Sequence, residues 1–314
     1  MKLIKPKAEL LLQKPGLEGI YKQIELAGRT CYRSTDKITE DSAKPFVDRM
    51  INSNHLAMLE HGTVYLLFDC TRKEYLDYHG QEYEQNPYSK VKFWSSDEDY
   101  DDRKYYITTN LRVLVENGWL DNLKYICEPT EYHEKRYTFR LTTSIGVTRE
   151  LNRHRVNSIA EMSTRYCNYS KDKFGNEVTF CIPSWLDIPE MTAIRERYGL
   201  KADCEGLSSI PQCLEFLNGL GDAENLYLKL INNGWQPQQA REVLPLCTAT
   251  EIIHTAFASD WKHFFDLRYF GTTGKPHPNM VELSTLMIKE AEKYNILNDI
   301  SNYDTTSNKL NPTL

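Results

Sequence analysis

The sequence lacks the apolar run of about 20 residues that a membrane-spanning helix needs. It also lacks a surplus of positive charge, since 38 Lys and Arg face 44 Asp and Glu and the formal net charge is −6. No global field therefore attracts nucleic acid or an anionic membrane, and any anionic ligand needs a local cluster of cations. The N-terminal residues show no signal-peptide pattern, so we expect a cytoplasmic protein.

The cysteines of the sequence follow no recognised motif spacing. The eight cysteines show neither a C-x-x-C pair nor a zinc-binding spacing, and they are Cys31, Cys70, Cys127, Cys167, Cys181, Cys204, Cys213 and Cys247. In a chain of 314 residues this distribution indicates free thiols in a reducing compartment and predicts no metal site.

The spacing of apolar residues predicts a mixture of helices and strands. Helical spacing follows Pro15-Gly16 and Thr39, and helices are also expected over 109–117, 144–154, 222–233, 248–267 and 281–294, with a short one at Pro237. Alternation predicts strands over 61–69 and 137–142. Residues 71–135 are rich in Tyr, Asp, Glu and Lys and are interpreted as an elaboration of the core fold. The mixture indicates the α+β class.

The densest chemical feature runs from Arg153-His154-Arg155 to Arg165-Tyr166, with Glu161 and Ser163 between them. Guanidinium groups bind phosphate through two parallel hydrogen bonds, and serine hydroxyls complete such pockets. The run is therefore typical of a site for a nucleotide monophosphate or a flavin diphosphate. It is equally compatible with a solvated basic helix end.

Three smaller clusters are less specific. Arg241 precedes an apolar run broken by Pro245, and Trp261 to Arg268 place aromatic residues and one Arg on the same side of a helix. Both patterns are commonly core packing with an Arg at the edge. His55 and Glu60-His61 stand before the first predicted strand, where a histidine is usually structural.

Taken in order, these blocks resemble the flavin-dependent thymidylate synthases. That family has R-H-R, seven residues and S, and here Arg153-His154-Arg155 precede Ser163 by that spacing. Glu161 to Tyr166 resemble the family's E-L-S-x-R-Y. Residues 240–245 resemble its A-R-x-V-L-P block, 264–268 its F-x-x-L-R block, and Glu60-His61 the E-H that opens its first core strand. The blocks extend over about residues 15–290, with 71–135 as an apparent insertion.

The resemblance implies one α+β domain over residues 1–314, built on a twisted, mostly antiparallel sheet with long helices. This is the thymidylate synthase complementing protein fold, assembled as a homotetramer with active sites between subunits. It further implies a methyltransferase that converts dUMP to dTMP, with 5,10-methylenetetrahydrofolate as one-carbon donor and FAD reduced by NADPH as hydride donor. No cysteine then needs a catalytic role.

By position, the resemblance also assigns site residues. Arg268 would face the pyrimidine and activate it. The dUMP site would comprise Glu150, Leu151, Arg153, Glu161, Met162, Ser163, Thr164, Arg165, Arg241 and Arg268. The FAD site would comprise His55, Ala57, Arg153, His154, Arg155, Glu161 and His263. Four positions depart from the family pattern: Glu150 replaces Gln, Ala160 replaces Asn, Phe257 replaces Asn and Cys31 replaces Ser.

Three other functions compete with this one. Arginines interleaved with tyrosines could bind RNA, although the acidic net charge opposes it. A flavoprotein with another substrate would not need the Arg241 and Arg268 blocks. A metal hydrolase built from His55, His61 and His154 would lack any known ligand spacing.

Overall fold

The computed structural model describes residues 1–95, 103–186 and 211–301. The strands of this part are β1 (Lys2–Ile4), β2 (Lys7–Leu11), β3 (Thr63–Cys70), β4 (Lys90–Ser95), β5 (Arg103–Asn110), β6 (Arg136–Ser144), β7 (Ser158–Glu161), β8 (Thr179–Cys181) and β9 (Ala249–Phe257). The α-helices are α1 (Gly16–Cys31), α2 (Ala43–Asn52), α3 (Arg72–Asp77), α4 (Gly80–Gln85), α5 (Leu111–Asn117), α6 (Ile145–Leu151), α9 (Pro211–Asn232), α10 (Pro237–Ala240), α11 (Ala258–Arg268), α12 (Pro278–Lys293) and α13 (Leu297–Ser301).

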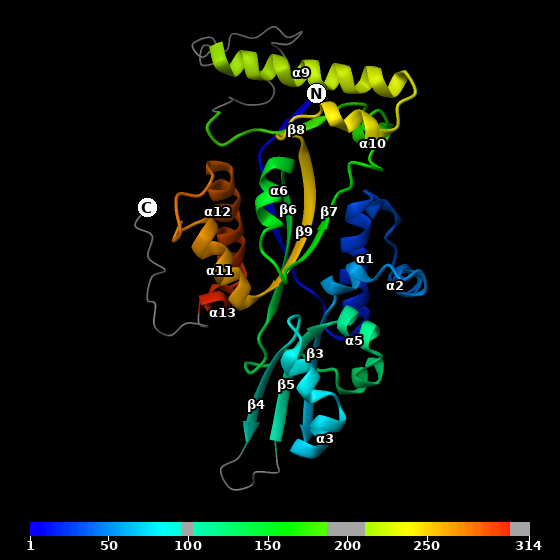
Figure 1. Cartoon of the computed structure of the whole chain (residues 1–314), viewed down its shortest axis with the longest axis vertical. Helices are drawn as coiled ribbons and strands as arrows, with labels where there is room; N and C mark the ends of the chain where they lie inside the picture. Colours follow the sequence, from blue (N-terminus) through cyan, green and yellow to red (C-terminus); the bar gives the residue numbers. More distant parts are fainter. Residues whose placement is uncertain (96–102, 187–210, 302–314) are drawn as a thin grey trace.

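A central antiparallel sheet has the strand order β2-β6-β9-β7. Its long strands β6 and β9 pair from Arg136↔Phe257 to Ser144↔Ala249. In Figure 1, α11, α12 and α13 lie on one side of this sheet and α1 on the other. The α+β class and the mostly antiparallel sheet predicted from the sequence are confirmed.

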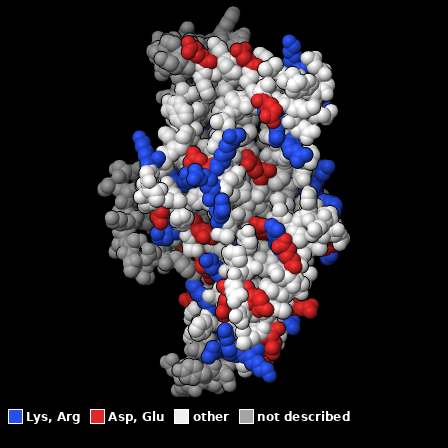
Figure 2. Space-filling view, in the orientation of Figure 1, with Lys and Arg blue, Asp and Glu red and all other residues white. Residues whose placement is uncertain are grey.

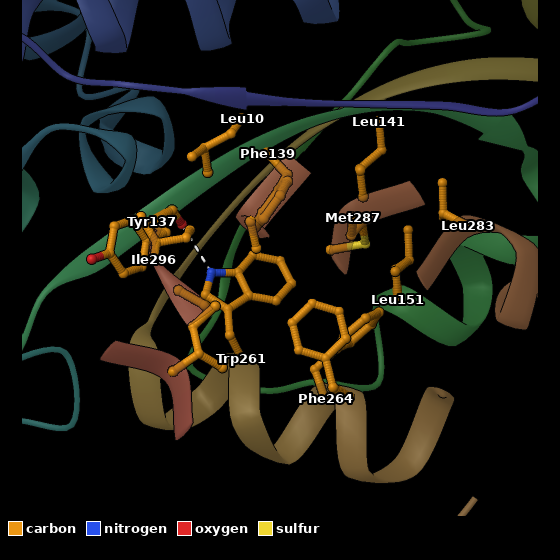
Figure 3. Packing of buried hydrophobic residues seen from close by; sticks show 14 of the residues in the cluster. Leu10, Tyr137, Phe139, Leu141, Leu151, Trp261, Phe264, Leu283, Met287 and Ile296 are labelled. Carbon is orange, nitrogen blue, oxygen red and sulfur yellow. Dashed lines mark hydrogen bonds between the residues drawn. The ribbon is translucent and has the colours of Figure 1, made fainter. Parts of the chain in front are cut away.

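The main core lies between the central sheet and α11–α13. Trp261 is fully buried there, and its Nε1 donates a hydrogen bond of 3.0 Å to the main-chain oxygen of Tyr137. Figure 3 shows this indole between Phe139 of β6 and Phe264 of its own helix. The Trp261 and Phe139 rings meet edge to face at 5.0 Å, a favourable geometry for aromatic pairs. This packing fixes α11, and with it the position of Arg268.

A second core forms around a three-stranded antiparallel sheet of order β3-β5-β4. Two of its strands, β4 and β5, come from residues 71–135, and β5 pairs with β3 along its whole length. The segment that the sequence marked as an elaboration is therefore part of a hydrophobic core that it shares with α1 and α2. That it is an insertion in a single domain stays a prediction.

The sequence prediction of one helix over 248–267 is wrong. Residues 249–257 form β9, and a helix begins only at Ala258. The error has a physical cause, since β9 is buried on both faces and buries Thr250, His254 and Thr255 as well as its apolar residues, so the sequence shows no apolar–polar alternation. Its Ile252, Ile253 and Thr255 are β-branched residues, which favour a strand.

Several helix boundaries also differ from the prediction. Helix α2 begins after Ser42 and not after Thr39, α6 ends at Leu151 and not near His154, and α9 begins at Pro211. Residues 109–110 belong to β5, and the Asn110 side chain caps α5. Within residues 1–95, 103–186 and 211–301, no helix combines the length and the apolar character needed to cross a membrane.

Candidate functional site

A cavity of about 600 Å³ lies where α6 and its following loop meet α11. Ser144 begins α6 by accepting a hydrogen bond from the Val147 N–H, which is a common helix cap. The short helix directs Glu150 toward the cavity, and the chain then turns through Arg153-His154-Arg155. The lining residues are Glu150, Arg153, His154, Arg155, Asn157, Asp260, His263, Leu267, Arg268, Thr273, Gly274, Lys275, Pro276 and His277.

Arg268, the last residue of α11, is held by three hydrogen bonds at the wall of this cavity. Its Nη1 donates to a Glu150 carboxylate oxygen at 2.9 Å and its Nη2 to the Glu150 main-chain oxygen at 3.2 Å. Its Nε donates to Nε2 of His154 at 3.0 Å. The guanidinium plane is therefore fixed before any ligand binds.

His154 is buried beside this cation and is held neutral. Burial is the main cause that lowers its pKa to about 4, and the charges of Arg268, His263 and Arg153 act in the same direction. Its Nε2 accepts a hydrogen bond from Arg268, so the ring proton lies on Nδ1. The imidazole also packs edge to face on Phe264, with ring centroids 4.9 Å apart.

Arg153 and Arg155, on either side of the buried histidine, point their charge outward. Both are exposed, and in the described part of the chain neither side chain makes an ion pair or a hydrogen bond. Figure 2 shows basic side chains gathered over the middle of the molecule, where Figure 1 draws α6 and α11. Two exposed guanidinium groups at the rim of a cavity are suited to bind phosphate.

A second group of predicted residues follows β7. Thr148 donates a hydrogen bond of 3.0 Å to the Glu161 carboxylate, whose pKa is raised mainly by burial. Arg241 donates to the Thr164 hydroxyl at 3.1 Å, which joins the A-R-x-V-L-P block to the loop after Glu161. The N–H of Ser163 donates to the carbonyl of Cys31 at the end of α1. This second group is therefore linked by hydrogen bonds to α6 and to α1.

The structure brings some of the predicted residues together and separates others. Six of them line the cavity: Glu150, Arg153, His154, Arg155, His263 and Arg268. The others lie outside its lining: His55, Ala57, Leu151, Glu161, Met162, Ser163, Thr164, Arg165 and Arg241. His55 and Ala57 are exposed at a 3₁₀ helix over Leu56–His61, and the side chain of Leu151 is fully buried in the main core.

Sequence reasoning missed part of the cavity wall. Asn157, Asp260 and residues 273–277 also line it. The Gly-rich stretch directly after the F-x-x-L-R block was a usable signal, because glycines at positive φ mark a tight loop. Gly271 and Gly274 have φ values of 67° and 145°.

Two of the departures from the family pattern have local explanations. Ala160 is buried against Ala27 and Ile253, where a polar amide would lose its hydrogen bonds to water. Phe257 is buried under Lys90 and Arg136, whose charged groups lie 5.6 and 5.3 Å from its ring centroid. These contacts are favourable cation–π geometries.

Five of the cysteines in the described part of the chain have a raised pKa, which is the opposite of an activated thiol. Burial is the main cause that raises the pKa of Cys31, Cys70, Cys127 and Cys247 to about 11 and that of Cys181 to about 12. A thiol attacks as its thiolate, so at neutral pH these five are weak nucleophiles. Among residues 1–95, 103–186 and 211–301, no three His, Cys, Asp or Glu lie close enough together to hold a metal ion.

Comparison with known proteins identifies the family. The model of the family described as "Thymidylate synthase complementing protein" matches residues 118–294, which is more than half of the chain. The chain belongs to this family. The match includes the R-H-R motif, Arg241 and Arg268, and it confirms the family predicted from these motifs. Residues 1–117, with the Glu60-His61 block, lie outside it.

Two curated relatives of the family are each named "Flavin-dependent thymidylate synthase". The protein of Thermosipho melanesiensis is 31% identical over 140 residues, which cover 44% of this chain and 56% of the relative. That of Pyrococcus furiosus is 30% identical over 121 residues, which cover 38% of this chain and 41% of the relative. The chain thus spans about half the length of these relatives. A solved UMP/dUMP methylase PolB from Streptomyces cacaoi, bound with 5-Br dUMP, aligns over 93% of both chains with 17% identity and a TM-score of 0.42.

Proposed function

We propose that this protein is a flavin-dependent thymidylate synthase that methylates dUMP to dTMP. The one-carbon donor would be 5,10-methylenetetrahydrofolate, and the hydride donor would be FAD reduced by NADPH. The observation that carries the proposal is the preoriented Arg268 guanidinium at a cavity rimmed by two exposed arginines. Membership of the family supports the same reaction.

Arg268 has the features required to activate a uracil ring. C5 of uracil is a weak nucleophile until the ring gains electron density, and ionisation at N3 supplies it. A guanidinium beside the N3 and O4 atoms would stabilise that anionic ring, because it remains charged at neutral pH. Preorganised charge of this kind stabilises developing charge without reorganisation during the reaction. The three hydrogen bonds that fix Arg268 supply the preorganisation.

The methyl group requires a methylene carbon and a hydride, while C5 of dUMP loses its hydrogen as a proton. FAD, when bound, supplies the hydride after reduction by NADPH. The residues at the cavity rim fit such a group, because the Arg153 and Arg155 guanidiniums have no partner among the described residues and can bind a diphosphate. His154 and His263 line the same cavity, and the His263 side chain is exposed. His55, Ala57 and Glu161 complete the proposed FAD set, on the strength of the family pattern alone.

The dUMP set divides into two groups within one copy of the chain, and we propose that sites shared between copies bring such groups together. Glu150, Arg153 and Arg268 line the cavity, whereas Glu161 and the residues to Arg165, with Arg241, lie outside its lining. A homotetramer with sites between subunits would bring the first group of one copy to the second group of another. Leu151 would contribute through its main chain, because its side chain is buried. Ser163 and Arg165 are assigned to dUMP binding.

The proposal is tested by NADPH oxidation with the purified protein and FAD, in the presence and absence of dUMP. We expect strong stimulation by dUMP but not by dCMP, which has no N3 proton to lose. Bound FAD without any effect of dUMP would indicate a flavoprotein with another substrate. Failure to bind FAD, combined with salt-dependent binding of RNA, would favour the nucleic-acid function. We also propose that the protein acts in the cytoplasm.

A further inference from the structure

The hydrogen bonds of Arg268 leave a defined part of its guanidinium for a ligand. A guanidinium has five N–H donors, one on Nε and two on each terminal nitrogen. One donor of each nitrogen is taken, by His154, by the Glu150 carboxylate and by the Glu150 carbonyl. The two remaining donors lie on Nη1 and Nη2. By binding one donor of each terminal nitrogen, Glu150 determines which N–H groups of Arg268 remain available to a ligand.

Glu150 occupies a position that is unfavourable without its partner. It lies in the last turn of α6, where a negative charge opposes the partial negative charge of the helix end. The ion pair with Arg268 offsets this cost, and the two side chains are 27% and 18% exposed. The Glu150 main chain takes part as well, so the whole residue is bound to Arg268.

The carboxylate also changes the charge that a ligand meets. Arg268 alone would present a full positive charge to an anion, but with Glu150 at 2.9 Å the pair is close to neutral. An uncharged acceptor of the same shape, such as the glutamine amide oxygen, would keep the hydrogen bond and restore the positive charge. Substitutions of Glu150 can therefore change the affinity for an anion without changing the orientation of Arg268.

We propose that Glu150 is a positioning residue that fixes the plane of Arg268 for the reaction and, by its charge, weakens the binding of dUMP. This inference rests on the proposed function. It differs from direct contact between Glu150 and the nucleotide, because the carboxylate acts through Arg268.

Three variants separate the two effects: Glu150→Gln, Glu150→Ala and Glu150→Asp. Each is measured for dUMP dissociation by calorimetry without folate and NADPH, and for kcat of dTMP formation. We expect the Gln and Ala variants to bind dUMP about tenfold more tightly, because both remove a charge close to the bound anion. We expect kcat to stay within about threefold of wild type for Gln but to fall about 100-fold for Ala, which leaves Arg268 without its anchor. The Asp variant keeps the charge on a shorter side chain, so kcat should fall without a gain in affinity.

Glu116→Gln is the matched control. Glu116 accepts a hydrogen bond of 2.8 Å from Arg112 on α5, remote from the cavity, and its loss should change neither quantity. Unchanged dUMP affinity in Glu150→Gln would overturn the charge effect. Equal kcat values in the folded Gln, Ala and Asp variants would overturn the positioning effect. A wild-type protein that forms no dTMP would refute the proposed function itself, whatever the variants bind.

Discussion

Replacing Arg268 by alanine removes the group that we propose activates dUMP. The change deletes three hydrogen bonds, of which two go to Glu150 and one to His154. Because the ion pair is partly exposed, we expect the free energy of unfolding to fall by only about 1–2 kcal/mol. Loss of one preorganised charge from an active site typically lowers kcat by about 10²–10³-fold. The effect on turnover should therefore far exceed the effect on stability.

The assay combines dTMP formation with the flavin absorbance of the purified variant. Arg268→Ala should retain FAD, because Arg153 and Arg155 remain at the cavity rim. Arg140→Ala is a suitable control, since it removes an Arg–Glu pair with Glu9 on the sheet surface. Turnover by folded, flavin-loaded Arg268→Ala within about threefold of the wild type, well short of the roughly 10²-fold loss expected, would rule out this role for Arg268.

Three further changes test other parts of the account. Arg153→Lys should lower kcat/KM by about tenfold or more, because an ammonium cannot replace a two-pronged guanidinium contact; unchanged steady-state kinetics would contradict the contact. Burial is the chief cause that lowers the pKa values of His61 and His254 to about 3 and that of His154 to about 4. In the unfolded chain each of these histidines binds a proton near pH 6.5, whereas in the folded chain it remains neutral at that pH. The free energy of unfolding should therefore fall by about 2 kcal/mol per histidine between pH 7 and pH 5, and equal urea midpoints at the two pH values would argue against this. Trp261→Ala should lower the free energy of unfolding by about 3–5 kcal/mol, because it empties the centre of the core in Figure 3; a loss below about 1 kcal/mol in denaturant titration would contradict that packing.

The sequence was informative where local chemistry decides the structure. Ser144 was predicted to begin a helix and does cap α6, and the alternation after His61 predicted the strand β3. The spacing from Arg153 to Ser163 identified the family, because those residues lie close together in the chain and need no knowledge of the fold. Local signals of this kind do not depend on distant partners.

Prediction from the sequence failed where tertiary contacts determine the structure. Burial on both faces removed the alternation from β9, so its sequence could not be distinguished from that of a helix. The anchors of Arg268 lie 118 and 114 residues earlier in the chain, and no periodicity connects them. The acidic, tyrosine-rich composition of 71–135 concealed two strands. Tyr105 and other tyrosines of this segment are buried in the core, but the many charged residues beside them make its overall composition typical of a surface.

The proposed methylation at C5 can be followed by the conversion of dUMP labelled with tritium at that carbon. With FAD, NADPH and 5,10-methylenetetrahydrofolate, we expect tritium to be released to water in step with dTMP formation, and omission of any one component to stop both. No tritium release from a folded protein with bound FAD would contradict methylation at C5 and would direct the search to another substrate of the Arg268 cavity.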